Sequence, residues 1–403
     1  MRSSTAVRRA VLVAALLAGT VGPTLDAVAA APVKLPSAAR TAASSDAHVA
    51  RRAVTARVAS ALGPGGEIRG MVLNDQNYES RGILGNIPEF PKMAKEGITS
   101  IAIYLYVYVA TPTSNEVSSG VYTPSDTELQ VVAAAAQASG LAVQFMPILL
   151  NSQNIEGRST YVPTDVNVFF ASYTTQIVHY ADLAKSLGVS LFYVGSENRP
   201  LEKYTAQWRA LIAATREHYS GALSYMSIPS TFTTVKFWDR LDLAAVSPYV
   251  SMGTDLYPTY ERDVAAWTTV HSAYFARLAA YAKIPLVYGE AGFNSQAGSF
   301  SHPAYSETPR GAPAPAAQAD AYRALLDVLA KTPGIYGVTW FRWVVGSTPL
   351  DMGYSPAGKP AECVLAAHWS TDATVRMLAS QRVCDLHALD AAMAGLAIPS
   401  VHY

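Results

Sequence analysis

Eight short apolar segments alternate with amphipathic segments along most of this 403-residue chain, and this alternation restricts the fold more than any other feature. Each segment is apolar almost throughout rather than at every second position, which is typical of parallel strands buried on both faces. The segments cover residues 68–73, 98–109, 141–150, 189–196, 222–228, 242–251, 284–292 and 335–343. Eight strands separated by helices over roughly 280 residues match the size of a (β/α)8 TIM barrel, and we predict that fold.

The stretches between the predicted strands carry helix-start and helix-stop signals. Ser125 follows Thr-Pro and precedes Glu128 by three residues, as at a helix N-terminus, and Gly140 ends the same amphipathic stretch. Further helices are expected over residues 87–95, 165–186, 204–218 and 316–329, and in a long stretch ending near Lys283. A doubly wound open sheet is the structural alternative, but no G-x-G-x-x-G motif joins an early strand to a helix.

The N-terminal residues are typical of an export signal. Arg2, Arg8 and Arg9 precede a short apolar run and then the small residues 27–31, as in a secretory signal peptide. The run is shorter than the ~20 residues that cross a bilayer, so we expect a secreted, extracellular protein without a stable membrane association. We assign the chain to four parts: a signal peptide (1–30), a flexible linker (31–64), the barrel (65–345) and a short C-terminal extension packed on it (346–403).

Composition narrows the possible partners. Lysine plus arginine and aspartate plus glutamate both number 30, so no basic surplus exists to bind nucleic acid. Charged residues make up 15% and hydrophobic residues 50%, which predicts a large core and excludes a disordered chain. The eight histidines include no H-E-x-x-H pair, and we expect neither a metal nor a cofactor. Cys363 and Cys384 are expected to form a disulfide outside the cell, two unrelated buried thiols being the alternative.

Two glutamates stand where barrel enzymes keep their catalytic groups, at the C-terminal ends of strands. Glu197 ends the fourth predicted strand in YVGSEN, and Glu290 ends the seventh in VYGEAGF. Two carboxyl groups facing one opening suit glycoside hydrolysis, because one protonates the leaving oxygen while the other attacks the anomeric carbon or activates water. Either glutamate alone could be a capping or salt-bridging residue, but their joint placement favours a catalytic pair.

Aromatic, amide and guanidinium side chains near other strand ends are the candidate sugar-binding groups. Flat aromatic faces can stack on sugar rings, while polar side chains can bond sugar hydroxyls. The candidates are Tyr249, Trp340 and Trp343 on the sixth and eighth strands, and Asn74, Asn151 and Arg158 after the first and third. Core packing is the alternative for Trp343, and the three polar residues could instead support loops.

Several stretches resemble the endo-β-1,4-mannanases of glycoside hydrolase family 113 over most of residues 67–345. The more specific ones are YTAQWRALIAATREHYSGALSY and the FWDRLD of VKFWDRLDLAAVSPYV; TPSDTEL, VSLFYVGSE, PLVYGEAGFNS and TWFRW also match. The resemblance implies a retaining enzyme with Glu197 as acid/base and Glu290 as nucleophile. It also implies that Tyr249 orients the nucleophile and that Trp340 lies beneath the sugar at the cleavage point.

Three departures from the family pattern fall among the residues expected to contact sugar. Asn198 follows Glu197, Arg158 follows Gly157 without a preceding tryptophan, and Val250 follows Tyr249. The expected partner is therefore a polysaccharide or oligosaccharide, possible substrates being β-1,4-mannan, xylan, glucan or a cell-wall glycan. A non-catalytic carbohydrate-binding barrel is the alternative from another functional class, and a monomer is expected in every case.

Overall fold

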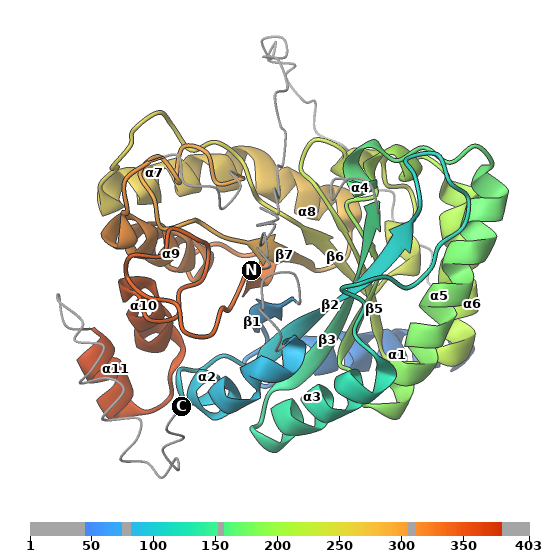
Figure 1. The fold of residues 1–403 in the computed structure, drawn as a ribbon, viewed down its shortest axis with the longest axis horizontal. Helices are drawn as coiled ribbons and strands as arrows, with labels where there is room; N and C mark the ends of the chain where they lie inside the picture. Colours follow the sequence, from blue (N-terminus) through green and yellow to red (C-terminus); the bar gives the residue numbers. More distant parts are fainter. Residues whose placement is uncertain (1–44, 75–81, 152–156, 305–310, 381–403) are drawn as a thin grey trace, which may run out of the picture.

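The computed structural model describes residues 45–74, 82–151, 157–304 and 311–380 and confirms the predicted (β/α)8 barrel (Figure 1). Eight parallel strands follow one another around a closed barrel in sequence order, and β8 pairs with β1. The strands are β1 (Ile68–Leu73), β2 (Ser100–Val109), β3 (Ala142–Asn151), β4 (Leu191–Ser196), β5 (Ala222–Ser227), β6 (Leu243–Val246), β7 (Leu286–Ala291) and β8 (Ile335–Trp340).

Helices surround the barrel, with those labelled α5 and α6 on one side of the view and α9 and α10 on the other (Figure 1). The longer helices are α1 (Ser45–Leu62), α3 (Asp126–Ala138), α5 (Val166–Ser186), α6 (Thr205–His218), α7 (Tyr260–Val270), α9 (Pro315–Leu329) and α10 (Pro360–Trp369). The shorter ones are α2 (Phe90–Lys95), α4 (Gly157–Thr160), α8 (Ala276–Ala282) and α11 (Ala373–Ala379). Ser125 and Glu128 form the capping box that begins α3, as the sequence predicted.

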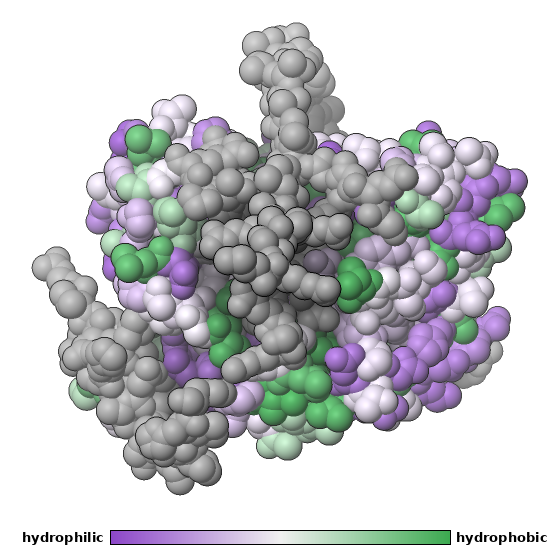
Figure 2. All heavy atoms as spheres, in the orientation of Figure 1, coloured by the Kyte–Doolittle hydropathy of each residue, from purple (hydrophilic) through white to green (hydrophobic). Residues whose placement is uncertain are grey.

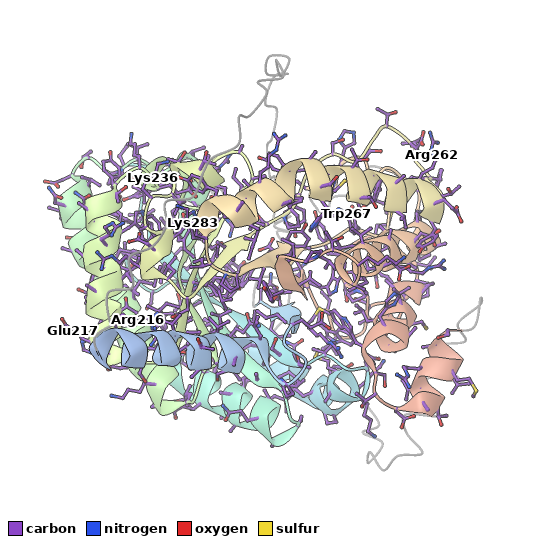
Figure 3. All side chains as sticks on the ribbon, turned by 180° about the vertical axis from the view of Figure 1, so that it is seen from behind. Arg216, Glu217, Lys236, Arg262, Trp267 and Lys283 are labelled. Carbon is purple, nitrogen blue, oxygen red and sulfur yellow. The ribbon has the colours of Figure 1, made fainter. Side chains whose placement is uncertain are left out.

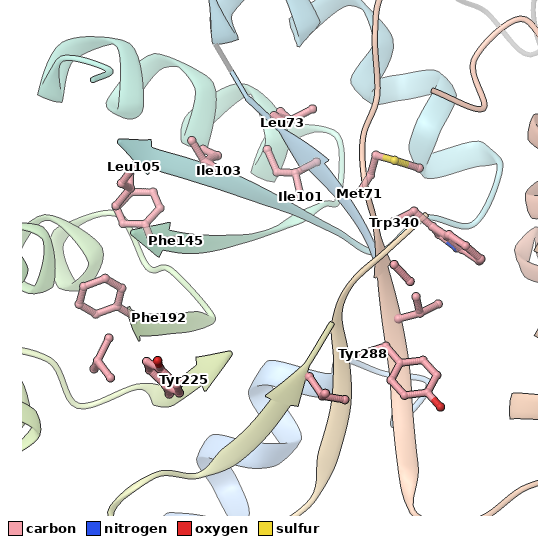
Figure 4. Close-up of a cluster of buried hydrophobic side chains, with 14 of the residues drawn as sticks. Met71, Leu73, Ile101, Ile103, Leu105, Phe145, Phe192, Tyr225, Tyr288 and Trp340 are labelled. Atoms are coloured by element: carbon pink, nitrogen blue, oxygen red, sulfur yellow. The ribbon is translucent and has the colours of Figure 1, made fainter. Parts of the chain in front are cut away.

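Alternate residues of each strand divide the apolar side chains into two layers. In β2, Ile101, Ile103 and Leu105 face outward and join the cluster between the strands and the helices (Figure 4). The intervening Tyr104 and Tyr106 face inward and belong to a second cluster that fills the barrel. Because side chains alternate between the two faces of a strand, a shift of one residue moves a side chain from one layer to the other.

The predicted linker is wrong over its second half, because residues 45–62 form helix α1. Its last residues, Ala61 and Leu62, are buried against side chains that begin the strands and close the N-terminal end of the barrel. Arg57 of α1 binds the buried carboxylate of Asp242 at 2.9 Å, and Arg216 of α6 binds the same carboxylate from the other side. Figure 3 shows Arg216 beside α1. Residues 31–44 lie outside the described part of the chain.

The residues after 345, predicted to pack on the barrel, include α10, which follows β8 and packs against α9. Lys92 of α2 forms an ion pair of 2.6 Å with the buried Glu362 of α10, and Ser370 donates a hydrogen bond to the carbonyl of Lys95. The segment from α10 to α11 therefore packs on the barrel. Over the described residues, no helix combines the length and apolar character required to cross a membrane. Hydrophilic side chains cover much of the outer surface of α5 and α6 (Figure 2).

Candidate active site

Glu197 and Glu290 lie at the C-terminal ends of β4 and β7, the end at which barrels of this kind carry their active sites. The side chain of Glu197 is 15% exposed, and Glu290 is 5% exposed. Strict alternation would place Glu290 on the outward face with Tyr288, but the pairing of β7 with β8 shifts register between Tyr288 and Ala291. Such an irregularity re-aims a side chain, and here it turns Glu290 toward the inward-facing Tyr104.

The backbone of Glu197 is held in an unusual conformation. Its φ is 52°, in the left-handed region that a non-glycine residue adopts at a cost of roughly 1–3 kcal/mol. Two contacts from β5 hold the turn: the Glu197 amide donates to the carbonyl of Met226 at 2.7 Å, and the Asn198 amide donates to the Tyr225 hydroxyl at 3.0 Å. The pairing of β4 with β5 also shifts register just before this turn. The surrounding structure thus fixes the direction of the Glu197 side chain.

The Glu290 carboxyl group receives two tyrosine hydroxyls. Tyr249 donates to Oε1 at 3.1 Å, and Tyr104 donates to Oε2. Burial and the negative charge of Glu290 raise the pKa of both tyrosines well above the usual value, so both remain protonated donors at neutral pH. Glu290 is therefore held by two hydroxyl donors that also favour its ionised form.

The Glu197 carboxyl group has different partners. Ser247, which follows β6, donates to Oε1, and Nη2 of Arg158 lies 3.3 Å from Oε2. Burial lowers the pKa of Arg158, but the charges of Glu197 and Glu290 outweigh this and leave the pKa above its usual value. Arg158 is thus a permanent positive charge that both carboxyl groups share.

The two glutamates interact electrostatically. Burial and the charge of Glu197 raise the pKa of Glu290, while Arg158, Tyr104 and Tyr249 act in the opposite direction; the net shift is upward. Proton binding by one carboxyl group therefore depends on the charge of the other. Two carboxyl groups in one site that have different hydrogen-bond partners can take different roles, one as the charged group and the other as the proton donor.

Comparison with known protein families adds an independent observation. The sequence model of Glycoside Hydrolase Family 113 matches residues 86–354, which is more than half of the chain. The chain belongs to glycoside hydrolase family 113. The resemblance noted in the sequence is thereby confirmed, and the protein is a glycoside hydrolase of this family with a carbohydrate as its substrate. At the level of sequence, no curated protein matches the chain.

Solved structures agree with the family 113 assignment. The family 113 β-mannanase AaManA from Alicyclobacillus acidocaldarius, in complex with ManMIm, is 25% identical, with a TM-score of 0.67 over 76% of this chain and 97% of that one. A family 113 β-1,4-mannanase at 23% identity has a TM-score of 0.64 over 76% of this chain and 99% of that one, and shows the shared fold. A β-glucuronidase from Ruminococcus gnavus shares only the fold, at 12% identity and a TM-score of 0.53 over 75% and 50% of the chains.

The structure brings together four of the residues that the sequence singled out in this family 113 protein: Glu197, Glu290, Arg158 and Tyr249. Asn74 and Asn151 are buried at the ends of β1 and β3. The side-chain oxygen of Asn74 accepts a hydrogen bond of 3.0 Å from Arg342, a buried residue just after β8. Cys384 lies outside the described residues, so its pairing with Cys363, which is buried in α10, stays a prediction.

The structure contradicts the prediction that Trp340 and Trp343 contact the sugar. Both are fully buried in the cluster between the barrel and its helices, and Figure 4 shows Trp340 in this cluster. The ring of Trp340 stacks on Tyr322 of α9 with ring centroids 3.8 Å apart. The next residue, Phe341, packs on the inward cluster and stacks on Tyr104 at 6.1 Å. An error of one residue reverses the face of a strand, and Phe341 occupies the position expected for Trp340.

Tyr104, Ser247 and Phe341 are site residues that the sequence analysis missed. A signal existed for Tyr104, because tyrosines at 104, 106 and 108 recur with the two-residue period of a strand and must share one face. Ser247 gave no comparable signal, since its contact with Glu197 depends on how β4, β5 and β6 are staggered in the barrel.

Glu202 is a further buried carboxyl group, close behind the turn that carries Glu197. Tyr225 and Ser227 of β5 donate to its Oε1 at 3.1 and 2.8 Å. Burial raises its pKa to about 7, although hydrogen bonds from Thr231, Ser227 and Tyr225 act to lower it. Because Tyr225 also accepts the Asn198 amide, Glu202 supports the turn of Glu197.

Replacing Glu202 with glutamine should change the pH dependence of stability. A carboxyl group whose pKa is raised by folding stabilises the protein below its unfolded pKa, and this contribution is lost as the pH rises through 7. Between pH 4.5 and pH 8, wild type should therefore lose up to about 3 kcal/mol of unfolding free energy that Glu202→Gln does not lose. Urea unfolding at both pH values measures this, with the exposed Glu116→Gln as control. A difference between Glu202→Gln and wild type that does not vary with pH would contradict it.

Proposed function

We propose that this protein is a secreted, retaining, endo-acting β-glycoside hydrolase whose substrate is a β-1,4-mannan. The observation that carries the reaction class is the pair Glu197 and Glu290, held at the ends of β4 and β7 by separate donor sets and sharing Arg158. Family 113 membership and the 25% identity to the β-mannanase AaManA support mannan as the substrate.

In the first step, an oxygen of Glu290 attacks the anomeric carbon and forms a glycosyl ester. The bond from that carbon to the leaving oxygen breaks, and Glu197 gives this oxygen its proton. Tyr104 and Tyr249 hold Glu290 in place for the attack. Arg158 keeps a positive charge beside both carboxyl groups as negative charge moves from Glu290 to Glu197.

In the second step, Glu197 accepts a proton from water, and the resulting hydroxide attacks the anomeric carbon. The ester bond to Glu290 breaks, Glu290 regains its charge, and Glu197 is protonated as at the start. Each step inverts the anomeric configuration, so the product has the configuration of the substrate. No cofactor takes part in this proposed cycle.

A panel of polysaccharides tests the proposed substrate. Incubation with β-1,4-mannan, xylan, β-glucan and galactan should release reducing ends from mannan at least about ten times faster than from the others. A mixture of oligosaccharides early in the reaction would support endo cleavage. If reducing ends were released faster from xylan or β-glucan, that polysaccharide and not mannan would be the substrate. If none of the polysaccharides released reducing ends, a carbohydrate-binding role would be favoured.

Replacing Tyr249 with phenylalanine should move the acidic limb of the pH profile. The Tyr249 hydroxyl favours ionised Glu290, so its loss should raise the pKa of Glu290 and shift the acidic limb of kcat/KM to higher pH. The expected shift is about one unit, because a hydrogen bond to a charged group contributes about 1.5 kcal/mol. Tyr354→Phe is the matched control, since the Tyr354 hydroxyl instead donates to the carbonyl of Pro303. Equal shifts in both variants would refute this role of Tyr249.

Export is the part of the proposal that depends on residues 1–30, which lie outside the described part of the chain. Arg2, Arg8 and Arg9, the short apolar run and the small residues 27–31 support it. N-terminal sequencing of protein recovered from culture medium is expected to show a chain that begins at or close to residue 31. Retention of the full-length chain inside the cell would contradict export.

A further inference from the structure

Six aromatic rings form a continuous series that passes beside Glu290. The outer members, Tyr249 and Tyr122, come from the segments after β6 and β2, and Tyr249 and the central Tyr104 donate hydrogen bonds to Glu290. The ring centroids of successive pairs are 6.3 Å (Tyr249–Tyr354), 5.2 Å (Tyr354–Phe341), 6.1 Å (Phe341–Tyr104), 5.9 Å (Tyr104–Tyr106) and 6.3 Å (Tyr106–Tyr122) apart. Tyr354, Tyr104 and Tyr106 are buried, whereas Tyr249, Phe341 and Tyr122 are partly exposed.

The β2 tyrosines lead from the catalytic pair toward the rim of the barrel. Tyr104 donates to Glu290, and Tyr106 lies two residues further along the strand, about 7 Å toward its C-terminal end. Tyr106 borders the active site, because its ring packs edge-on against that of Tyr104 in the inward-facing cluster. Tyr122 packs edge-on against Tyr106 and is the next ring outward.

The segment that presents Tyr122 is firmly anchored to β2. Tyr108 and Ser118 exchange backbone hydrogen bonds of 2.8 and 2.9 Å, and the Thr123 hydroxyl donates to the carbonyl of Tyr106 at 2.6 Å. The Tyr122 amide donates to the Tyr108 hydroxyl at 3.3 Å. At Gly120, a Cβ atom would lie only 2.3 Å from the Tyr108 ring, so glycine is required for this close approach. The backbone that carries Tyr122 is therefore fixed, and the Tyr122 ring packs against the buried ring of Tyr106.

We propose that Tyr122 is a stacking platform for a sugar unit of a β-linked polysaccharide, at a position removed from the cleavage point. The inference rests on the proposed function and extends its binding site along Tyr104, Tyr106 and Tyr122. A partly exposed, rigid aromatic ring offers apolar area at little entropic cost, which suits the flat face of a sugar ring. Binding there would favour longer oligosaccharides over short ones, because a short substrate does not reach this ring.

Kinetics with substrates of different length test the platform. Tyr122→Ala should lower kcat/KM on a manno-hexasaccharide about ten-fold, mainly through KM, and on an aryl β-mannoside less than about two-fold. Tyr122→Phe keeps the ring and should retain most of the wild-type selectivity for length, whereas Tyr122→Leu should lose it. Val121→Ala alters the neighbouring side chain, which is 82% exposed, and should leave both substrates unaffected. Equal losses on both substrates, or no loss on the hexasaccharide, would overturn the proposal.

A binding measurement separates this inference from the proposed function. Calorimetric titration of manno-oligosaccharides into Glu290→Gln, with and without Tyr122→Ala, should show affinity rising with chain length only when Tyr122 is present. If wild type hydrolyses none of the polysaccharides but this length dependence is found, the proposed activity fails and the platform stands. If wild type hydrolyses mannan but Tyr122→Ala leaves the length dependence unchanged, the platform fails and the activity stands.

Discussion

Replacing Glu290 with glutamine is expected to lower kcat by about four to six orders of magnitude, the range seen when an enzyme loses one member of a catalytic group that acts as a unit. An amide cannot form the glycosyl ester, so the loss should be similar for good and poor leaving groups. Glutamine keeps the volume of the side chain; its amide oxygen can accept from one of the hydroxyls of Tyr104 and Tyr249, and its NH2 group can donate to the oxygen of the other. The thermal unfolding midpoint should therefore stay close to that of wild type.

The matched control for Glu290→Gln is Glu362→Gln, which changes a buried glutamate in α10, outside the site. It should retain kcat, although loss of its ion pair with Lys92 can reduce stability. If Glu290→Gln kept more than about one per cent of wild-type kcat, Glu290 could not be the nucleophile.

Replacing Glu197 with alanine should produce a loss that depends on the leaving group. On mannan, where the departing oxygen needs a proton, kcat/KM should fall by about 10²–10⁴. On an aryl glycoside with a good leaving group, formation of the glycosyl ester should be little affected, and slow hydrolysis of the ester should limit turnover. The variant should therefore show a burst of released phenol followed by a slow steady rate.

Azide provides the control for the assignment of Glu197. A small anion can enter the space left by the carboxyl group and attack the glycosyl ester without a general base. Azide should accelerate Glu197→Ala and yield a glycosyl azide of β configuration, while leaving Glu290→Gln inactive. Rescue of Glu290→Gln with a β-glycosyl azide, and none of Glu197→Ala, would exchange the two roles.

The barrel was predictable because its strands are short apolar runs bounded by turn residues. β1 begins and ends where the sequence indicated, whereas β6 ends at Val246, before the residue 251 expected from its apolar sequence. Pro248 cannot donate to a strand ladder, which is a physical reason for the early end. Helix α1 was not predictable from apolar periodicity, because it has no repeating buried apolar face over its residues from 54 onward. In that part of the helix the buried apolar side chains are those of Ala61 and Leu62, in the last turn.

The candidate site was only partly predictable. Glu197 and Glu290 could be found because each is the first acidic residue at the end of an apolar strand. The sequence could not predict which face a side chain at the end of β8 occupies. Gly337 and the register shifts between β7 and β8 disturb the alternation of inward and outward side chains along the strand. This is why Phe341 rather than Trp340 contacts Tyr104. Ser247 lies beyond sequence reasoning because no local pattern relates it to Glu197.

The configuration of the first product tests most directly whether the reaction is a double displacement through Glu290. Attack by Glu290 and then by water inverts the anomeric carbon twice, whereas attack by water alone inverts it once. Proton NMR of a β-manno-oligosaccharide digest, recorded before mutarotation, should show the β anomer of the new reducing end first. Appearance of the α anomer first would show a single displacement and would remove Glu290 as nucleophile.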